Sequence, residues 1–294
     1  MLMVLAARSA TLDAGSVALA ICRYWSDAGR RSLFIDADLN GTSLADRFNE
    51  AMRADCSPAL RGMPSLVVSG EPLRLDTVAR HSYTVAGASD NMWLLFAPLN
   101  KTGARHTAGW LGERSGDVLR LSAERQVVVS SSLQRRDPHL HPLLGDAPAV
   151  VVLAAAETNK QVAELRALCR DSGLADVDAR RRLLVVDGPS TFGDEQLLSE
   201  TGLEVVGRIP AIADEKVLRV LVERKPAGSP RRRAFARRLT VLANDLDSLL
   251  SSEPPVATPI TGRDQRSPRD GFGPFAHALA SASAARERWE HGAA

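Results

Sequence analysis

The chain has 294 residues, 45% of them hydrophobic, which is enough for one large α/β domain with a tail. Its formal net charge of +2 gives no global argument for binding nucleic acid or an anionic membrane. The three cysteines, Cys22, Cys56 and Cys169, lie far apart in the sequence, which argues against a structural zinc site and a disulfide framework. No run of about 18 apolar residues occurs, so we expect no membrane span and a cytoplasmic protein.

The first 40 residues predict a strand, a helix and a second strand, in the order of a βαβ unit. Residues 3–7 are apolar and predict the first strand, and residues 16–28 predict an amphipathic helix. Residues 33–35 predict the second strand because three apolar residues run directly into two carboxylates, Asp36 and Asp38. Ligands of open α/β sheets bind at the carboxyl ends of such strands, so these carboxylates mark a candidate site.

Apolar strands and helices continue to alternate as far as about residue 250. The further predicted strands lie at residues 92–96, 126–129, 149–153, 183–186 and 204–209. The further predicted helices lie at residues 44–52, 65–68, 73–79, 108–125, 159–172, 194–202, 217–222 and 231–250. This alternation predicts a doubly wound α/β fold, with a mostly parallel sheet and helices on both faces.

The composition changes after residue 250, where prolines and glycines become frequent. We therefore expect one domain over residues 1–250 and a flexible tail over residues 251–294, with one candidate helix at 275–290. That candidate helix has few large apolar residues and balanced charges, so it does not predict a membrane-bound helix.

Four short motifs occur in the order and at the spacing of a known protein family. They are IDAD at 35–38, VVVS at 127–130, AVVVL at 149–153 and VVGRIP at 205–210, which resemble IDxD, VVVDTP, LLVTxP and VLGxIP. With these motifs, residues 1–250 resemble the MinD/ParA-like branch of P-loop ATPases. The stretch LNGTSLADRF at 39–48 is closest to DPxGGxLAxRF, which is typical of a branch from high-GC bacteria whose members often lack the P-loop lysine. The resemblance implies a P-loop NTPase-like fold.

The stretch that corresponds to the P-loop departs from the family pattern. Counting back from Asp36 places Ala14 on the phosphate-binding lysine and Ser9 on the family's extra signature lysine. Asp13 takes a glycine position and would repel a phosphate, and no side chain replaces the lysine charge. The resemblance assigns the degenerate nucleotide site to Asp13, Ala14, Gly15, Ser16, Asp187 and Pro210.

The resemblance also implies roles for the two carboxylates. It gives Asp38 the role of polarising the attacking water, and it gives Ser16 and Asp36 the role of holding Mg²⁺. The alternative is that both carboxylates are inherited, with Asp36 accepting hydrogen bonds from the loop at the strand end and capping the next turn. Because the phosphate cradle is incomplete, we expect no bound cofactor. ATP and Mg²⁺ are the expected cofactors if the site is functional.

These observations predict a pseudo-ATPase, namely a non-catalytic or weakly nucleotide-binding scaffold that positions or regulates a protein partner. By resemblance, the partner belongs to a pilus or secretion system, to chromosome partitioning or to cell division, and a homodimer is also considered. One alternative is an active ATP hydrolase that uses Asp38. Another is a partitioning protein that binds DNA through the basic stretch 224–238. The candidate DNA contacts are Arg231, Arg232, Arg233, Arg237 and Arg238.

Overall fold

The computed structural model describes residues 2–8, 14–40, 44–52, 61–85, 91–133, 140–210 and 230–252. The predicted helix at 217–222, the candidate helix at 275–290 and the rest of the tail beyond residue 252 lie outside these ranges. In the part of the chain that the structure describes, no helix is both long and apolar enough to cross a lipid bilayer.

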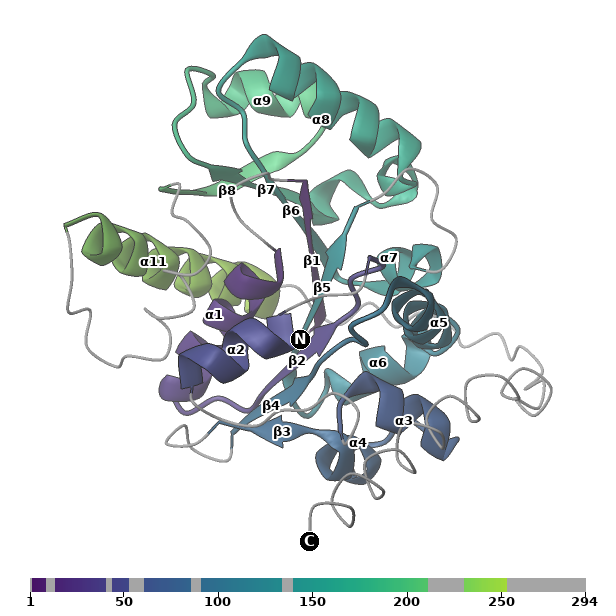
Figure 1. The fold of residues 1–294 in the computed structure, drawn as a ribbon. Helices are drawn as coiled ribbons and strands as arrows, with labels where there is room; N and C mark the ends of the chain where they lie inside the picture. The colour runs from purple at the N-terminus through teal and green to yellow at the C-terminus, as the bar shows by residue number, and fades with distance from the viewer. Residues whose placement is uncertain are drawn as a thin grey trace, which may run out of the picture.

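Within these ranges, eight strands form one sheet at the centre of the fold (Figure 1). The strands are β1 (Leu2–Arg8), β2 (Ser32–Asp36), β3 (Tyr83–Thr84), β4 (Met92–Leu95), β5 (Gln126–Ser132), β6 (Ala149–Ala154), β7 (Arg182–Asp187) and β8 (Glu204–Ile209). They lie in the order β3-β4-β2-β5-β1-β6-β7-β8, and each neighbouring pair is parallel except β3 with β4. The predicted doubly wound, mostly parallel sheet is confirmed.

Helices cover both faces of this sheet, as Figure 1 shows. On one face, α1 (Ala14–Asp27), α2 (Leu44–Met52) and α11 (Pro230–Ser252) enclose a core that contains Ile21, Phe34 and Leu242. The other face is covered by α3 (Met63–Ser69), α4 (Leu75–His81), α5 (Lys101–Gly112), α6 (Ser115–Leu121), α7 (His141–Asp146), α8 (Asn159–Asp171) and α9 (Asp194–Thr201). Strands β2 and β6 are buried along their whole length, which explains the apolar run at residues 33–35 of β2 and the wholly apolar sequence of β6.

The predicted helix at residues 108–125 is wrong in its extent. The chain instead forms α5 and α6, with a break between them at Glu113 and Arg114. Helix α5 starts earlier than predicted because Asn100 caps it: the Asn100 side chain accepts a hydrogen bond from Gly103 N at 2.7 Å. Strand β3 and helix α7 were not predicted, because elements of two and six residues are too short to show a periodic pattern.

The α3–α4 hairpin docks on the sheet through a close backbone contact at Gly62. Gly62 N donates to His81 O at 2.7 Å, and Met63 N donates to Phe96 O at 3.0 Å, so the start of α3 is held at the end of β4. Gly62 has φ of +85°, and a Cβ atom on it would lie 2.9 Å from Phe96 O. This position therefore requires glycine both for its conformation and for its proximity to the Phe96 carbonyl.

Candidate functional site

The two candidate carboxylates lie at the carboxyl edge of the sheet, beside the end of β5. Asp36 is the last residue of β2 and stands in register with Ser130 of β5. It is almost fully buried, with 1% of its surface exposed. Asp36 Oδ1 accepts hydrogen bonds from Asp38 N at 3.2 Å and from Ser130 Oγ at 3.5 Å. The side chain therefore stabilises the turn that leaves β2 and links it to β5.

Asp38 is held by contacts within the protein. Its Oδ1 atom accepts hydrogen bonds from Ser132 Oγ at 2.9 Å, Asn40 N at 3.0 Å and Asn40 Nδ2 at 3.4 Å. Asn40 Nδ2 also lies 3.3 Å from Ser132 Oγ, so the three side chains form a closed group. We call Asp38, Asn40 and Ser132 the Asp38 cluster. It fixes the carboxylate against the end of β5.

Two more hydrogen bonds join the ends of β2 and β5. Ala37 N donates to Ser130 O at 2.8 Å, and Ser131 Oγ donates to Ala37 O at 3.2 Å. Each of the three serines at 130–132 thus contributes to tying the loop after β2 to β5. These serines form the end of β5, and pairing with β1 continues to Ser132.

The amino end of α1 faces the same edge of the sheet. Ala14, Gly15 and Ser16 form the buried first turn of α1, and this turn contains no acidic residue. Ser16 Oγ is buried and has no hydrogen-bond partner among the described residues. A helix amino terminus favours an anion, but a phosphate would find no lysine here. Ser9 and Asp13 lie outside the described residues.

The described residues do not fit a Mg²⁺-bound nucleotide. Ser16 is fully buried, and the position before it is a glycine, which offers no hydroxyl ligand. Among the described residues, no group of three or more His, Cys, Asp or Glu side chains could hold a metal ion. Mg²⁺ at a nucleotide takes one or two protein oxygens and completes its octahedron with waters and phosphates, so the misfit here is the hydroxyl position, which is a glycine. No chemical step through Mg²⁺ or ATP follows from this arrangement.

Asp187 and Pro210 lie at the carboxyl edge too, but away from Asp36. Asp187 ends β7 and is buried, and Pro210 directly follows β8. Gly188 N donates to Ile209 O at 2.8 Å, which holds the ends of these two strands together. Strands β5, β1 and β6 stand between β2 and β7. The described residues Asp36, Asp187 and Pro210 thus end or follow strands along one edge of the sheet.

The candidate DNA contacts are on α11. Arg231 and Arg232 lie in its first turn, and Arg233, Arg237 and Arg238 are exposed. The helix packs on the sheet through the buried residues Phe235, Leu239, Leu242, Ala243 and Leu246. Among the described residues, none forms an ion pair with Arg233, Arg237 or Arg238. This part of α11 therefore presents uncompensated positive charge to solvent.

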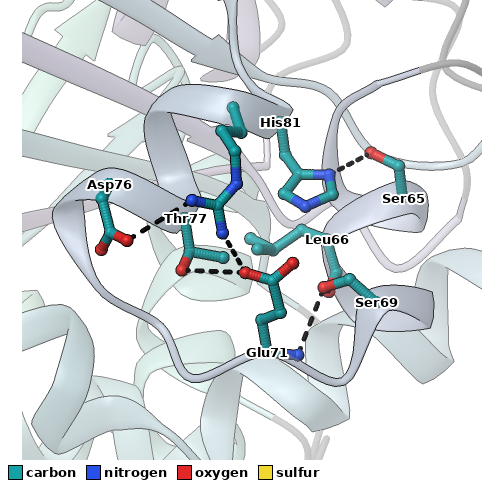
Figure 2. Close-up of polar contacts among 8 residues, drawn as sticks. Ser65, Leu66, Ser69, Glu71, Asp76, Thr77 and His81 are labelled. Atoms are coloured by element: carbon teal, nitrogen blue, oxygen red, sulfur yellow. Dashed lines mark hydrogen bonds and ion pairs between the residues drawn. The ribbon is translucent and has the colours of Figure 1, made fainter.

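The α3–α4 hairpin carries a polar cluster that sequence reasoning missed (Figure 2). Ser65 Oγ lies 2.9 Å from His81 Nδ1, while Glu71 pairs with Arg80 and accepts from Thr77 Oγ1 at 3.4 Å. The pKa of His81 is lowered, chiefly by burial; Glu71 opposes this shift, and Arg80 and Arg61 add to it.

Serine, histidine and glutamate together suggest a nucleophile and its base, but Ser65 Oγ also donates to Gly62 O at 3.1 Å. With that hydrogen on Gly62 O, the contact with Ser65 Oγ is made by His81 Nδ1 as donor, so His81 does not act as the base of Ser65. The contacts in Figure 2 instead tie α3 to α4.

The sequence signals for the Asp38 cluster were weak but present. Parallel strands in register place the residues that follow them side by side, and Asn40 stands two residues after Asp38, as in an Asx turn. No sequence spacing connects Ser65 with His81, which are 16 residues apart on different helices.

Comparison with known proteins identifies the fold. No protein-family model matches the sequence, and no curated protein matches it. Among solved structures, the chain is similar to a ParA family ATPase from Chlorobium tepidum TLS, with a TM-score of 0.63, 11% identity, and 83% of this chain and 98% of that chain covered.

Two structures that contain MinD are also similar to this chain. The septum site-determining protein MinD of Pyrococcus horikoshii OT3, complexed with Mg-ADP, gives a TM-score of 0.59 at 12% identity, with coverage of 85% of this chain and 97% of that chain. The MinC:MinD cell division protein complex of Aquifex aeolicus gives a TM-score of 0.57 at 14% identity, with coverage of 84% of this chain and 96% of that chain. The predicted MinD/ParA-like fold of P-loop ATPases is confirmed.

Proposed function

From this MinD/ParA-like fold, we propose that the protein is a scaffold with degenerate ATPase motifs, which binds nucleotide weakly or not at all and positions or regulates a protein partner. The observation that carries the proposal is the Asp38 cluster. The residue that the resemblance assigns to the attacking water accepts hydrogen bonds from Ser132 and Asn40 of its own chain.

Two further features support a non-catalytic role. Phosphoryl transfer depends on positioning and charge neutralisation, for which P-loop ATPases use a lysine and a hydroxyl-bound Mg²⁺. Here the corresponding turn of α1 offers alanine and glycine, and Ser16 is buried. The loop after β2 is also bonded directly to β5, in an arrangement that needs no nucleotide.

A protein partner agrees with the behaviour of a structurally similar protein. The MinD of Aquifex aeolicus was solved as a complex with MinC. From this precedent and the family resemblance, we propose that the partner is a protein of cell division, of chromosome partitioning or of a pilus or secretion system. We propose that this chain acts in the cytoplasm. We propose that residues 1–250 form the functional domain and that residues 251–294 form its flexible tail. A homodimer would need an interface that ATP does not bridge.

Non-specific DNA binding is the second candidate function. Arg233, Arg237 and Arg238 favour it, because they are exposed, pair with no described carboxylate, and can make phosphate contacts that release counterions and need no base readout. Under this alternative, binding to duplex DNA falls steeply with salt, and the change of Arg231, Arg232 and Arg233 to alanine abolishes it.

Calorimetry with ATP and with ADP, each with Mg²⁺, tests the proposed function. We expect no binding in the micromolar range and no release of phosphate from ATP. An active ATPase, in contrast, would bind ATP and lose its turnover in Asp38→Ala. Clear binding of ATP or ADP in the micromolar range would overturn the proposal.

A further inference from the structure

The amino-terminal edge of the sheet, opposite the Asp38 cluster, carries two neighbouring arginines that pair with no carboxylate among the described residues. Arg31 directly precedes β2, and Arg125 directly precedes β5. Gln126 N donates to Arg31 O at 2.8 Å, and Ser32 pairs with Gln126 in the parallel ladder. One step back along this register, Arg31 and Arg125 are adjacent on neighbouring strands.

Contacts within the protein fix the guanidinium group of Arg125. Its Nη1 atom donates to Asn91 O at 3.1 Å and to Ser32 O at 3.4 Å. Its Cζ atom lies 3.3 Å from the centre of the Trp93 ring, which holds the guanidinium plane by a cation–π contact. Only 8% of the surface of Arg125 is exposed. The group is therefore positioned in advance of any binding event.

The charge at this edge is not balanced. Within the described ranges, neither Arg31 nor Arg125 forms an ion pair, and the Nε atom of Arg125 is buried without a hydrogen-bond partner. The nearby carboxylate of Asp247 is already engaged, because it pairs with Arg30 and accepts from Gln126 Nε2 at 3.1 Å.

Burial lowers the pKa of Arg125 to about 10; the Arg31 charge adds to this shift, and Glu124 opposes it. A buried cation beside a second cation is costly unless an anion compensates it.

We propose that Arg31 and Arg125 bind an oxyanion, a phosphate or carboxylate group, at the amino edge of β2 and β5. Guanidinium groups match such groups in shape and charge, and the rigid Arg125 reduces the entropy lost on binding. Arg31 is exposed, and its side chain forms no hydrogen bond or ion pair with another residue that the structure describes. This site lies at the edge of the sheet away from the predicted nucleotide site, so it extends beyond the proposed function.

Tryptophan fluorescence of the full chain, titrated with inorganic phosphate at constant ionic strength, tests this site. Because Arg125 lies on the Trp93 ring, we expect a saturable change that is absent in Trp93→Phe. In Arg31→Gln we expect the apparent affinity to fall about tenfold, since one charge-assisted contact is lost. Arg31 has no partner in the described structure, so this variant should fold like the wild type.

Arg105→Gln is the matched control, because Arg105 on α5 is also exposed and also forms no ion pair with a described residue. It should leave the affinity unchanged. A parallel titration with glutarate separates the sources: binding of phosphate alone indicates a phosphoryl group, and binding of both indicates any oxyanion, and either result supports the site. No saturable change with either probe, or equal affinity in Arg31→Gln and wild type, would overturn the proposal.

Discussion

Replacing Gly62 by alanine should destabilise the fold far more than the same change at Gly70, although both glycines flank the short helix α3 and have positive φ. At Gly62, φ is +85° and ψ is −164°, a region that is open essentially to glycine only, which costs about 1–3 kcal/mol for alanine. The added Cβ would also lie 2.9 Å from Phe96 O, which belongs to the backbone and cannot rotate away. Such overpacking adds about 1–3 kcal/mol, so we expect a total near 4 kcal/mol.

Gly70 separates the two contributions. It has φ of +65° and ψ of 6°, and a Cβ on it would meet nothing within 4 Å. Gly70→Ala should therefore lose only about 1 kcal/mol, from the left-handed conformation alone. In a thermal melt followed by circular dichroism, these losses lower the Tm by about 10 °C for Gly62→Ala and by about 3 °C for Gly70→Ala. Equal shifts for the two variants would refute the claim that the Phe96 carbonyl restricts position 62.

Three further predictions concern the Asp38 cluster, the hairpin and α11. Ser132→Ala removes a hydrogen bond to a charged group, so it should lower the free energy of unfolding by about 1–2 kcal/mol in urea titrations, without creating ATP turnover. Because the pKa of His81 lies below 6.5 in the folded protein, its neutral form favours folding. This contribution to stability is fully present above about pH 6.5 and is lost as the pH falls through the lowered pKa of His81. The melting temperatures at pH 7.5 and pH 5 should therefore differ less in His81→Gln than in the wild type. Phe235→Ala should cost about 3–5 kcal/mol because the ring is fully buried, whereas Val241→Ala, at a half-exposed position of the same helix, should stay within about 0.5 kcal/mol.

The sheet could be predicted from sequence because its strands carry their signal locally. Residues 204–209 and 44–52 form the predicted strand and helix with the predicted bounds, and the central strands are apolar enough to be recognised without homologues. The short elements could not be predicted, because they carry no such local signal. Strand β3 forms because Tyr83 and Thr84 pair antiparallel with β4, and pairing with a neighbour leaves no periodic trace in two residues.

The candidate site was predictable only in part. The strand-end position of Asp36 and Asp38 followed from the apolar run before them. Their partners did not, since Ser130 and Ser132 are 94 residues away and meet them only through the pairing of β2 with β5. The same limit applies to Arg31 and Arg125, whose adjacency depends on register rather than on sequence distance.

Helix α11 has a consequence for how the chain matures on the ribosome. Trp25 of α1 donates its indole N–H to Ala243 O at 3.1 Å, and Gly207 of β8 lets Leu242 approach closely. Helix α11 thus packs on both α1 and β8, and it is synthesised after both of them. The part of α1 that packs on α11, including Trp25, therefore lacks its cover until about 250 residues have been translated. A nascent chain halted before α11 should accordingly aggregate, although its sheet is already encoded.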